Sequence, residues 1–125
     1  VASKIATLKG VRRALVRIQQ ALARGRSVVA EGRDTTTVVF PDAALKIYLT
    51  AREEVRARRR QAQLRDAGVS ADLPEVLAWL RERDRRDSTR EHSPLQIAKD
   101  AVVVDTSDRS VEEIVEEIAR RFKAI

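Results

Sequence analysis

Two short stretches of the chain carry residue types that could bind a phosphorylated ligand. Near the end of a helical pattern the chain reads Glu-Arg-Asp-Arg-Arg-Asp-Ser-Thr-Arg over residues 82–90, and upstream an apolar run ends in Glu-Gly-Arg-Asp at 31–34. A guanidinium group can hold a phosphate through two parallel hydrogen bonds, and a carboxylate accepts hydrogen bonds from amino and hydroxyl groups. The two stretches together therefore favour a site for a nucleoside monophosphate, and hence a kinase, over a generic basic domain.

The spacing within the second stretch supports this interpretation. Arg83, Asp87 and Arg90 stand at positions i, i+4 and i+7, and at about 3.6 residues per turn they share one helix face. Two phosphate-binding arginines and a carboxylate for a ribose hydroxyl could then converge on one ligand. The same pattern is also typical of a solvated helix face with ion pairs along it, and pattern alone leaves both readings open.

The first stretch follows an apolar run expected to be a strand. Ligands of open α/β sheets lie beyond the carboxyl ends of the strands, so Gly32-Arg33-Asp34 would face that crevice. Gly32 allows close approach of the backbone, Arg33 can bind phosphate, and Asp34 can accept hydrogen bonds. A surface turn with an Arg-Asp pair is the alternative. Arginines that could cover a second anionic group come later, at Arg56, Arg59, Arg60 and Arg65.

Composition narrows the class of protein. The 125 residues fit one domain, and the net charge of +6 favours an anionic partner such as a nucleotide, a nucleic acid or an acidic membrane. The chain has no Cys, which excludes disulfides and thiolate metal sites. No apolar stretch approaches the length of a membrane span and no signal peptide pattern opens the chain, so we expect a cytoplasmic protein without membrane contact. The first residue is Val, which suggests a start inside a longer chain.

Hydrophobic periodicity predicts the elements that would position these residues. Helices are expected over 9–24 (ended by Gly25), over 52–66 (ended near Gly68), from Pro74 through Asp87, and after a Ser110–Glu113 capping box. Short runs at 27–30, 45–49 and 101–104 predict strands, the first and last of them buried, and the run at 35–40 is β-prone and ends at Pro41. The order predicts an α/β fold with a parallel sheet flanked by helices.

The segment between the last two strands is almost entirely helical and highly charged. We expect residues 51–96 to form a mobile helical lid, broken at Ser93-Pro94, on a core made of 1–50 and 97–125. Within it, His92 is expected to be solvent-exposed rather than a general base. Asp105-Thr106 follows the last strand and could be a metal-binding carboxylate or, alternatively, a turn cap. Tyr48 and Trp79 are expected to be packing residues.

Several stretches, in order along nearly the whole chain, resemble bacterial cytidylate kinases. They are Ser-Lys-Ile-Ala-Thr-Leu-Lys-Gly-Val-Arg-Arg-Ala-Leu (3–15), Val-Ala-Glu-Gly-Arg-Asp (29–34) with Thr-Val-Val-Phe-Pro-Asp-Ala (37–43), Leu-Lys-Ile-Tyr-Leu-Thr-Ala (45–51) with 53–60, the lid segment 82–94, and 100–105 with 110–114. The resemblance implies a partial P-loop-kinase-like fold, namely the carboxy-terminal part of the enzyme without its phosphate-binding loop.

The resemblance also implies a role for individual residues. It places Ser3, Arg12 and Asp34 at positions that read the cytosine base. It places Asp87 at the ribose contact, and phosphate-binding positions at Arg33, Arg83 and Arg90. It implies that three arginines of the lid act on ATP and on the transferring phosphoryl group: Arg56, Arg59 and Arg60. The catalytic candidates are Arg59, Arg83 and Arg90.

The chain departs from the family pattern in three places. Thr35-Thr36-Thr37 stands where the family often has a hydrophobic residue, Gly and Thr, and Arg52 replaces a small polar residue. The chain contains no Gly-x-x-x-x-Gly-Lys-Ser/Thr loop, which binds ATP phosphates and positions Mg²⁺. The resemblance therefore implies CMP or dCMP and ATP as substrates and Mg²⁺ as cofactor of the complete enzyme, with no cofactor bound and no activity in this chain alone.

Two other functions remain open from the sequence. The Arg-rich helices could belong to a small basic RNA-binding module, although the scarcity of aromatic residues and the interspersed acids oppose this. The chain could also be a half-protein that docks onto a separate phosphate-loop partner through an exposed sheet edge.

Overall fold

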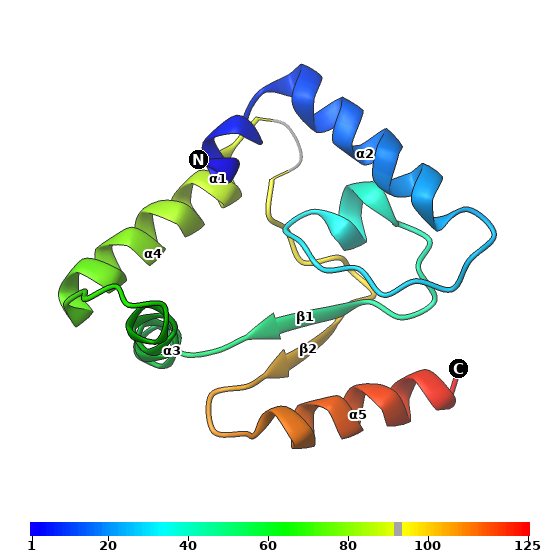
Figure 1. Ribbon diagram of the computed structural model, residues 1–125. Coiled ribbons are helices and arrows are strands. Elements are labelled where there is room, and N and C mark those ends of the chain that lie inside the picture. The colour runs from blue at the N-terminus through cyan, green and yellow to red at the C-terminus, as the bar shows by residue number, and fades with distance from the viewer. Residues whose placement is uncertain (92–93) are drawn as a thin grey trace. The chain divides into compact units, whose positions relative to one another are not determined.

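The computed structural model describes residues 1–91 and 94–125, so His92 and the predicted break at Ser93 lie outside the described residues. The elements are helices, two strands and one π-helical turn (Figure 1). In chain order they are α1 (Ala2–Ile5), α2 (Lys9–Ala23), η1 (Thr35–Val39), β1 (Ile47–Thr50), α3 (Glu53–Asp66), α4 (Leu73–Thr89), β2 (Val102–Asp105) and α5 (Val111–Lys123). Within the described part of the chain, no helix is both long and apolar enough to cross a membrane.

The chain divides into two compact units. Unit 1 comprises Val1–Lys46 and Arg85–Ala101, and unit 2 comprises Ile47–Asp84 and Val102–Ile125, so the division falls within α4. In unit 2, β1 and β2 pair in parallel from Ile47↔Val102 to Thr50↔Asp105. Parallel strands need a crossover connection, which the chain supplies between them. The predicted α/β fold with a parallel sheet flanked by helices is confirmed.

The predicted strand at residues 27–30 is wrong. The segment has no regular secondary structure, and Val29 is fully exposed while Val28 is half-exposed. A buried strand needs a neighbouring strand to satisfy its backbone, and the described residues form only β1 and β2, both in unit 2. The apolar composition of the run was therefore a misleading signal.

The β-prone run at residues 35–40 also does not form a strand. It makes the π-helical turn η1, in which the carbonyl of Asp34 accepts from the N–H groups of Val38 and Val39 at 2.9 and 3.1 Å. Val39 is 1% exposed, and the Nε2 of Gln20 on α2 donates to its carbonyl at 2.9 Å. Contact with α2 thus overrides the intrinsic β-propensity of Thr and Val.

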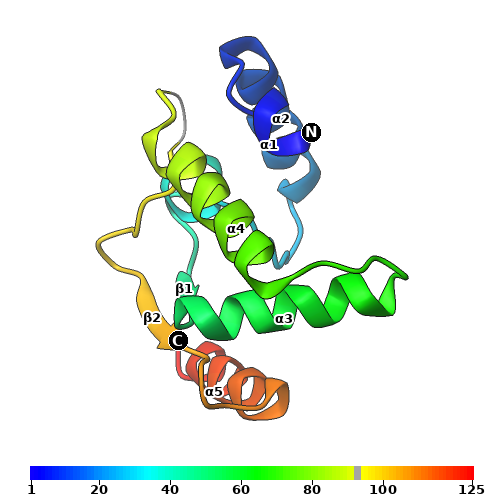
Figure 2. The ribbon, with the colours of Figure 1, turned by 90° about the vertical axis from the view of Figure 1, so that its left-hand side faces the viewer.

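The core of unit 2 lies between its helices. Ala57 of α3 is fully buried and packs with the buried Val76 and Leu80 of α4. The partly buried residues around them are Leu64, Ala71, Leu73 and Leu77. Figure 2 shows the beginning of α4 beside α3. After α3 the chain turns at Gly68, whose φ of +78° lies in the left-handed region that favours glycine. The predicted helix and its end near Gly68 are confirmed.

The helix termini follow the sequence signals closely. At α5, Ser110 accepts from the Glu113 N–H at 3.2 Å while the Glu113 carboxylate accepts from the Ser110 N–H at 2.8 Å. This is the predicted capping box, an arrangement worth about 1 kcal/mol. Gly25, with φ of +67°, follows the C-cap of α2 as predicted.

Candidate functional site

A buried ion pair in unit 1 joins α2 to the start of η1. The Asp34 carboxylate is 4% exposed and contacts the Nη2 of Arg12, whose side chain is also largely buried. The position of Arg12 follows from the helix of residues 9–23, and that of Asp34 from its role as N-cap of η1. Both charges are withdrawn from water, which is tolerated only because each neutralises the other.

A second buried carboxylate, that of Asp87, is contacted from two other segments of unit 1 and from Arg90 in its own segment. Asp87 is 2% exposed and accepts from the Ser3 hydroxyl of α1 at 3.2 Å. It also forms an ion pair with Arg33, whose Nε lies 3.0 Å from the carboxylate. The Arg90 guanidinium lies 4.0 Å away, and the Arg86 guanidinium donates to the Ser3 hydroxyl at 3.1 Å. Residues far apart in the sequence therefore meet at one carboxylate.

The two carboxylates share one electrostatic environment, which we call the unit 1 charge cluster: Arg12, Arg33, Asp34, Asp87 and Arg90. Burial lowers the pKa of the Arg90 guanidinium, the positive charges of Arg12 and Arg33 lower it further, and Asp34 and Asp87 oppose the shift. Three cations face two anions, so the cluster carries an excess positive charge. The Nε of Arg12 is also buried, without a hydrogen-bond partner among the described residues.

Four of the predicted site arginines lie in unit 2, and among the described residues they do not share one common partner: Arg56, Arg59, Arg60 and Arg83. The guanidinium carbons of Arg60 and Arg83 stand 5.2 and 5.5 Å from the centre of the Trp79 ring, within cation–π range. Arg56 forms a two-point ion pair with Asp84 at 2.7 and 3.0 Å, which raises the pKa of Arg56. Arg59 donates instead to Thr106.

The structure thus brings together Ser3, Arg12, Arg33, Asp34, Asp87 and Arg90 in unit 1, and places Arg56, Arg59, Arg60 and Arg83 in unit 2. Sequence reasoning missed the contacts of Arg86, Trp79 and Thr106. The Trp79–Arg83 contact had a usable signal, because residues four apart on a helix are neighbours. The Arg59–Thr106 contact had none, since 47 residues separate the pair.

The structure decides between the two readings of Asp105. Its carboxylate accepts from the N–H and the hydroxyl of Ser107 at 2.9 and 2.6 Å, contacts that lower its pKa. Asp105 is therefore a turn cap. Across residues 1–91 and 94–125, no group of three or more His, Cys, Asp or Glu side chains could hold a metal ion.

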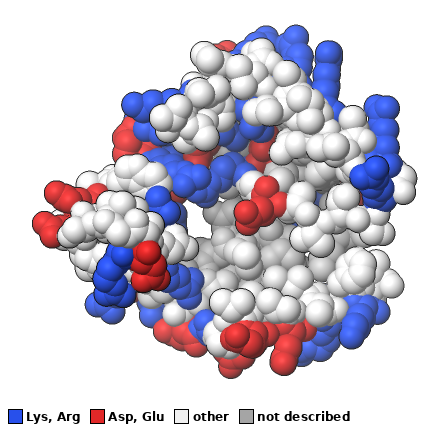
Figure 3. All heavy atoms as spheres, viewed as in Figure 1, with Lys and Arg blue, Asp and Glu red and all other residues white. Residues whose placement is uncertain are grey.

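Charges of both signs are interspersed on the face shown in Figure 3. Acidic side chains are visible there as well as Lys and Arg side chains. Nucleic acid binding relies on neutralising many successive phosphates, which acidic side chains oppose.

Comparison with known proteins identifies the family. The family model described as cytidylate kinase matches residues 1–124. Proteins named cytidylate kinase from Azotobacter vinelandii and Methylococcus capsulatus are 47% identical over 123 residues and 49% identical over 116 residues, covering 98% and 93% of this chain. One from Pseudomonas aeruginosa is 50% identical over 119 residues. The chain spans about half of their length, at 54%, 52% and 52%. Because the match runs through nearly every described element, the chain belongs to the cytidylate kinase family.

Proposed function

We propose that this chain supplies the nucleoside monophosphate site and the lid of an enzyme that transfers a phosphoryl group from ATP to CMP or dCMP. The observation that carries the proposal is the unit 1 charge cluster, together with Ser3. Its members come from α1, α2, the segment before η1 and the end of α4, and they converge with an excess positive charge. That arrangement suits a ligand with one anionic group and several polar hydrogens.

The base would be read by Asp34 and Arg12. A carboxylate accepts a hydrogen bond from the exocyclic amine of cytosine, whereas uracil presents an acceptor at that position. The Asp34 carboxylate is already oriented by Arg12, and the Arg12 Nε is buried without a hydrogen-bond partner among the described residues. Cytosine is therefore favoured over uracil by charge, with Ser3 adding a hydroxyl nearby.

The sugar and the phosphate would be held on the other carboxylate and its arginines. Asp87 accepts from a ribose hydroxyl, and Arg33 and Arg90 bind the phosphate, to which Arg83 brings a further positive charge. Arg33 and Arg90 lie beside Asp87 and neutralise its buried carboxylate.

Residues 51–96 would act as the lid over a core of 1–50 and 97–125. Phosphoryl transfer needs little acid–base chemistry and depends on positioning and charge neutralisation. Arg56, Arg59 and Arg60 supply such charges from the lid on the ATP side, and closure excludes water from the transferring group. Mg²⁺ would neutralise charge on ATP, but the described residues offer no three-ligand group for it, so we assign it no ligand here.

These 125 residues alone are expected to transfer no phosphoryl group from ATP to CMP. Their four glycines at 10, 25, 32 and 68 form no Gly-x-x-x-x-Gly-Lys-Ser/Thr loop to hold the ATP phosphates. A coupled assay of ADP production, on a preparation freed of host kinases, measures this directly. Sustained turnover that scales with the amount of the chain would contradict it.

The function itself is tested by Asp34→Asn, which keeps the shape of the side chain and removes its charge. In the enzyme reconstituted with a phosphate-loop segment, the ratio of kcat/KM for CMP to that for UMP is expected to fall about 5- to 150-fold, since the pair is worth about 1–3 kcal/mol of discrimination. Steady-state kinetics on both nucleotides gives the ratio. Glu31→Gln is the matched control, because it removes an exposed charge from the same segment. An unchanged ratio in Asp34→Asn would reject the assigned role.

A second candidate function is docking onto a separate partner that carries the phosphate loop. It is favoured by apolar side chains that the described residues leave exposed, among them Leu15, Ile18 and Leu22 on α2 and Val29 beyond it. The three leucine and isoleucine positions form one helical stripe, a pattern that normally faces a core. Sedimentation at several concentrations tests this candidate, and a monomer at all of them would count against self-association through these surfaces.

A further inference from the structure

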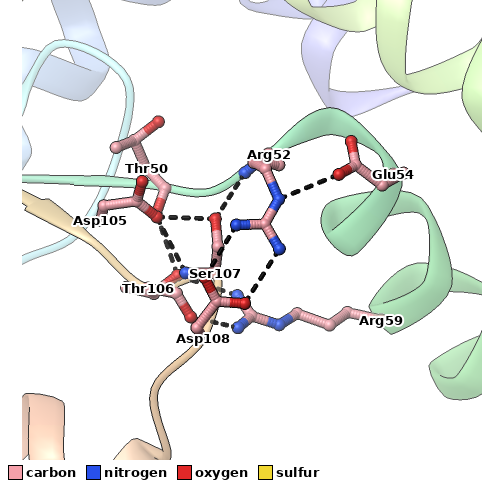
Figure 4. A network of polar contacts seen from close by, with 8 residues as sticks. All are labelled: Thr50, Arg52, Glu54, Arg59, Asp105, Thr106, Ser107 and Asp108. Atoms are coloured by element: carbon pink, nitrogen blue, oxygen red, sulfur yellow. Dashed lines mark hydrogen bonds and ion pairs between the residues drawn. The ribbon is translucent and has the colours of Figure 1, made fainter.

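A polar network in unit 2 ties α3 to the turn that follows β2 (Figure 4). The side chain of Arg59 reaches from α3 to Thr106, where its Nη1 donates to the hydroxyl oxygen at 2.9 Å and its Nη2 donates to the carbonyl oxygen at 2.6 Å. Thr106 therefore accepts hydrogen bonds from both terminal nitrogens of the guanidinium. The direction in which Arg59 points is fixed at two atoms.

Thr106 is itself held rigidly at the carboxyl end of the sheet. It is 7% exposed, its N–H donates to the Thr50 carbonyl at 2.8 Å, and its hydroxyl donates to the same carbonyl at 3.0 Å. With its proton directed at Thr50, the hydroxyl presents a lone pair to Arg59. The hydrogen bond to Thr50 thus orients the Thr106 hydroxyl as an acceptor for Arg59.

The turn is anchored independently of the Thr106 hydroxyl. The Arg52 guanidinium binds both carboxylate oxygens of Asp108 at 2.8 and 2.9 Å, and the Arg52 N–H donates to the Ser107 hydroxyl at 2.8 Å. The Thr106 N–H would still donate to the Thr50 carbonyl if the hydroxyl were removed. Removing the hydroxyl should therefore leave Arg59 held only at the Thr106 carbonyl, so that its side chain gains freedom while the turn stays in place.

The acceptors of Arg59 distinguish it from its neighbours. Arg52, Arg56 and Arg81 each bind a carboxylate. Arg59 is exposed, and its hydrogen bonds in the described part of the chain go to a hydroxyl and a carbonyl, both uncharged. Its positive charge is thus held in place without being neutralised, at the strand ends where ligands of α/β sheets bind.

We propose that Thr106 is a positioning residue that orders Arg59 as a binding group for the phosphate chain of the nucleoside triphosphate. Arg loses side-chain conformational freedom when it is fixed, and a residue that orders it beforehand reduces the entropic cost of binding the ligand. The inference rests on the proposed function and names a residue which that function had not used.

The test compares Thr106→Val, which removes the hydroxyl at nearly constant shape, with Thr106→Ser, which keeps it. Titration calorimetry of the 125-residue chain with inorganic tripolyphosphate is expected to show a Kd about three- to tenfold higher for Thr106→Val, because the ligand must then meet part of the cost of ordering the Arg59 side chain. Thr106→Ser is expected to restore the wild-type Kd. Equal affinities of the Val and Ser variants would overturn the proposal, as would a wild-type chain that does not bind tripolyphosphate.

Arg59→Ala decides whether Thr106 acts through Arg59. In that background Thr106→Val is expected to cause no further loss, which a purely structural role for Thr106 would not produce. An additional loss of the same size would overturn the proposal. Titration with CMP and UMP separates this inference from the proposed function. Absence of a CMP preference alongside Arg59-dependent tripolyphosphate binding would reject the monophosphate site and leave the Thr106 assignment standing.

Discussion

Asp87→Ala is expected to lower the free energy of unfolding by about 3–5 kcal/mol, the usual result of breaking a buried ion pair on one side. The carboxylate is 2% exposed and receives Ser3, Arg33 and Arg90. Without it, the guanidiniums of Arg33 and Arg90 would keep their positive charges with one fewer negative charge beside them, and Arg12 already lowers the pKa of Arg90. Urea denaturation of the 125-residue chain, followed by far-ultraviolet circular dichroism, measures the loss.

Two further variants make the Asp87 result specific. Asp42→Ala removes an exposed carboxylate from the same unit and is expected to change stability by no more than about 0.5 kcal/mol. Adding Arg33→Met to Asp87→Ala removes one stranded cation and is expected to recover part of the loss. A loss for Asp87→Ala no larger than that of Asp42→Ala would show that the cluster does not stabilise unit 1.

Arg83→Ala is expected to reduce kcat of the reconstituted enzyme about 10³- to 10⁵-fold, the range for an arginine that stabilises the transition-state charge of phosphoryl transfer. Arg83→Lys keeps the charge but loses the planar fork, and an intermediate rate is expected. The preference for CMP over UMP should stay near that of the wild type, because Arg83 is not assigned to the base. Steady-state rates with saturating ATP and each nucleotide measure both quantities.

The control for Arg83 is another arginine on the same helix. Arg81 pairs with Glu53 at 2.6 Å and is exposed, so Arg81→Ala is expected to change kcat only a few-fold. If Arg83→Ala behaved like Arg81→Ala, or if it altered base preference as much as Asp34→Asn does, the role assigned to Arg83 would be wrong.

The helices and the two paired strands could be predicted because their signals are local. Apolar periodicity, the left-handed positions at Gly25 and Gly68 and the Ser110 capping box each depend on residues within one or two turns. The runs at 27–30 and 35–40 failed for the opposite reason. Whether an apolar segment becomes a strand depends on a neighbour to pair with, and η1 instead takes its hydrogen bonds within itself and from Gln20.

The candidate site was predictable as a set of residues but not as a geometry. The resemblance named Ser3, Arg12, Arg33, Asp34 and Asp87, and the structure brings all of them together in unit 1. Ser3 and Asp87 are 84 residues apart and carry no sequence signal of their meeting. The roles assigned to them stay predictions, as does the division into core and lid.

The contact of Trp79 with Arg60 and Arg83 gives the protein an optical property. Trp79 is the one tryptophan in the sequence, so its indole emission arises from a single place, between residues of α3 and α4. Cations close to an indole ring alter the energy of its excited state. Movement of either guanidinium away from the ring should therefore shift the wavelength of maximum tryptophan emission, and no attached dye is needed to detect it.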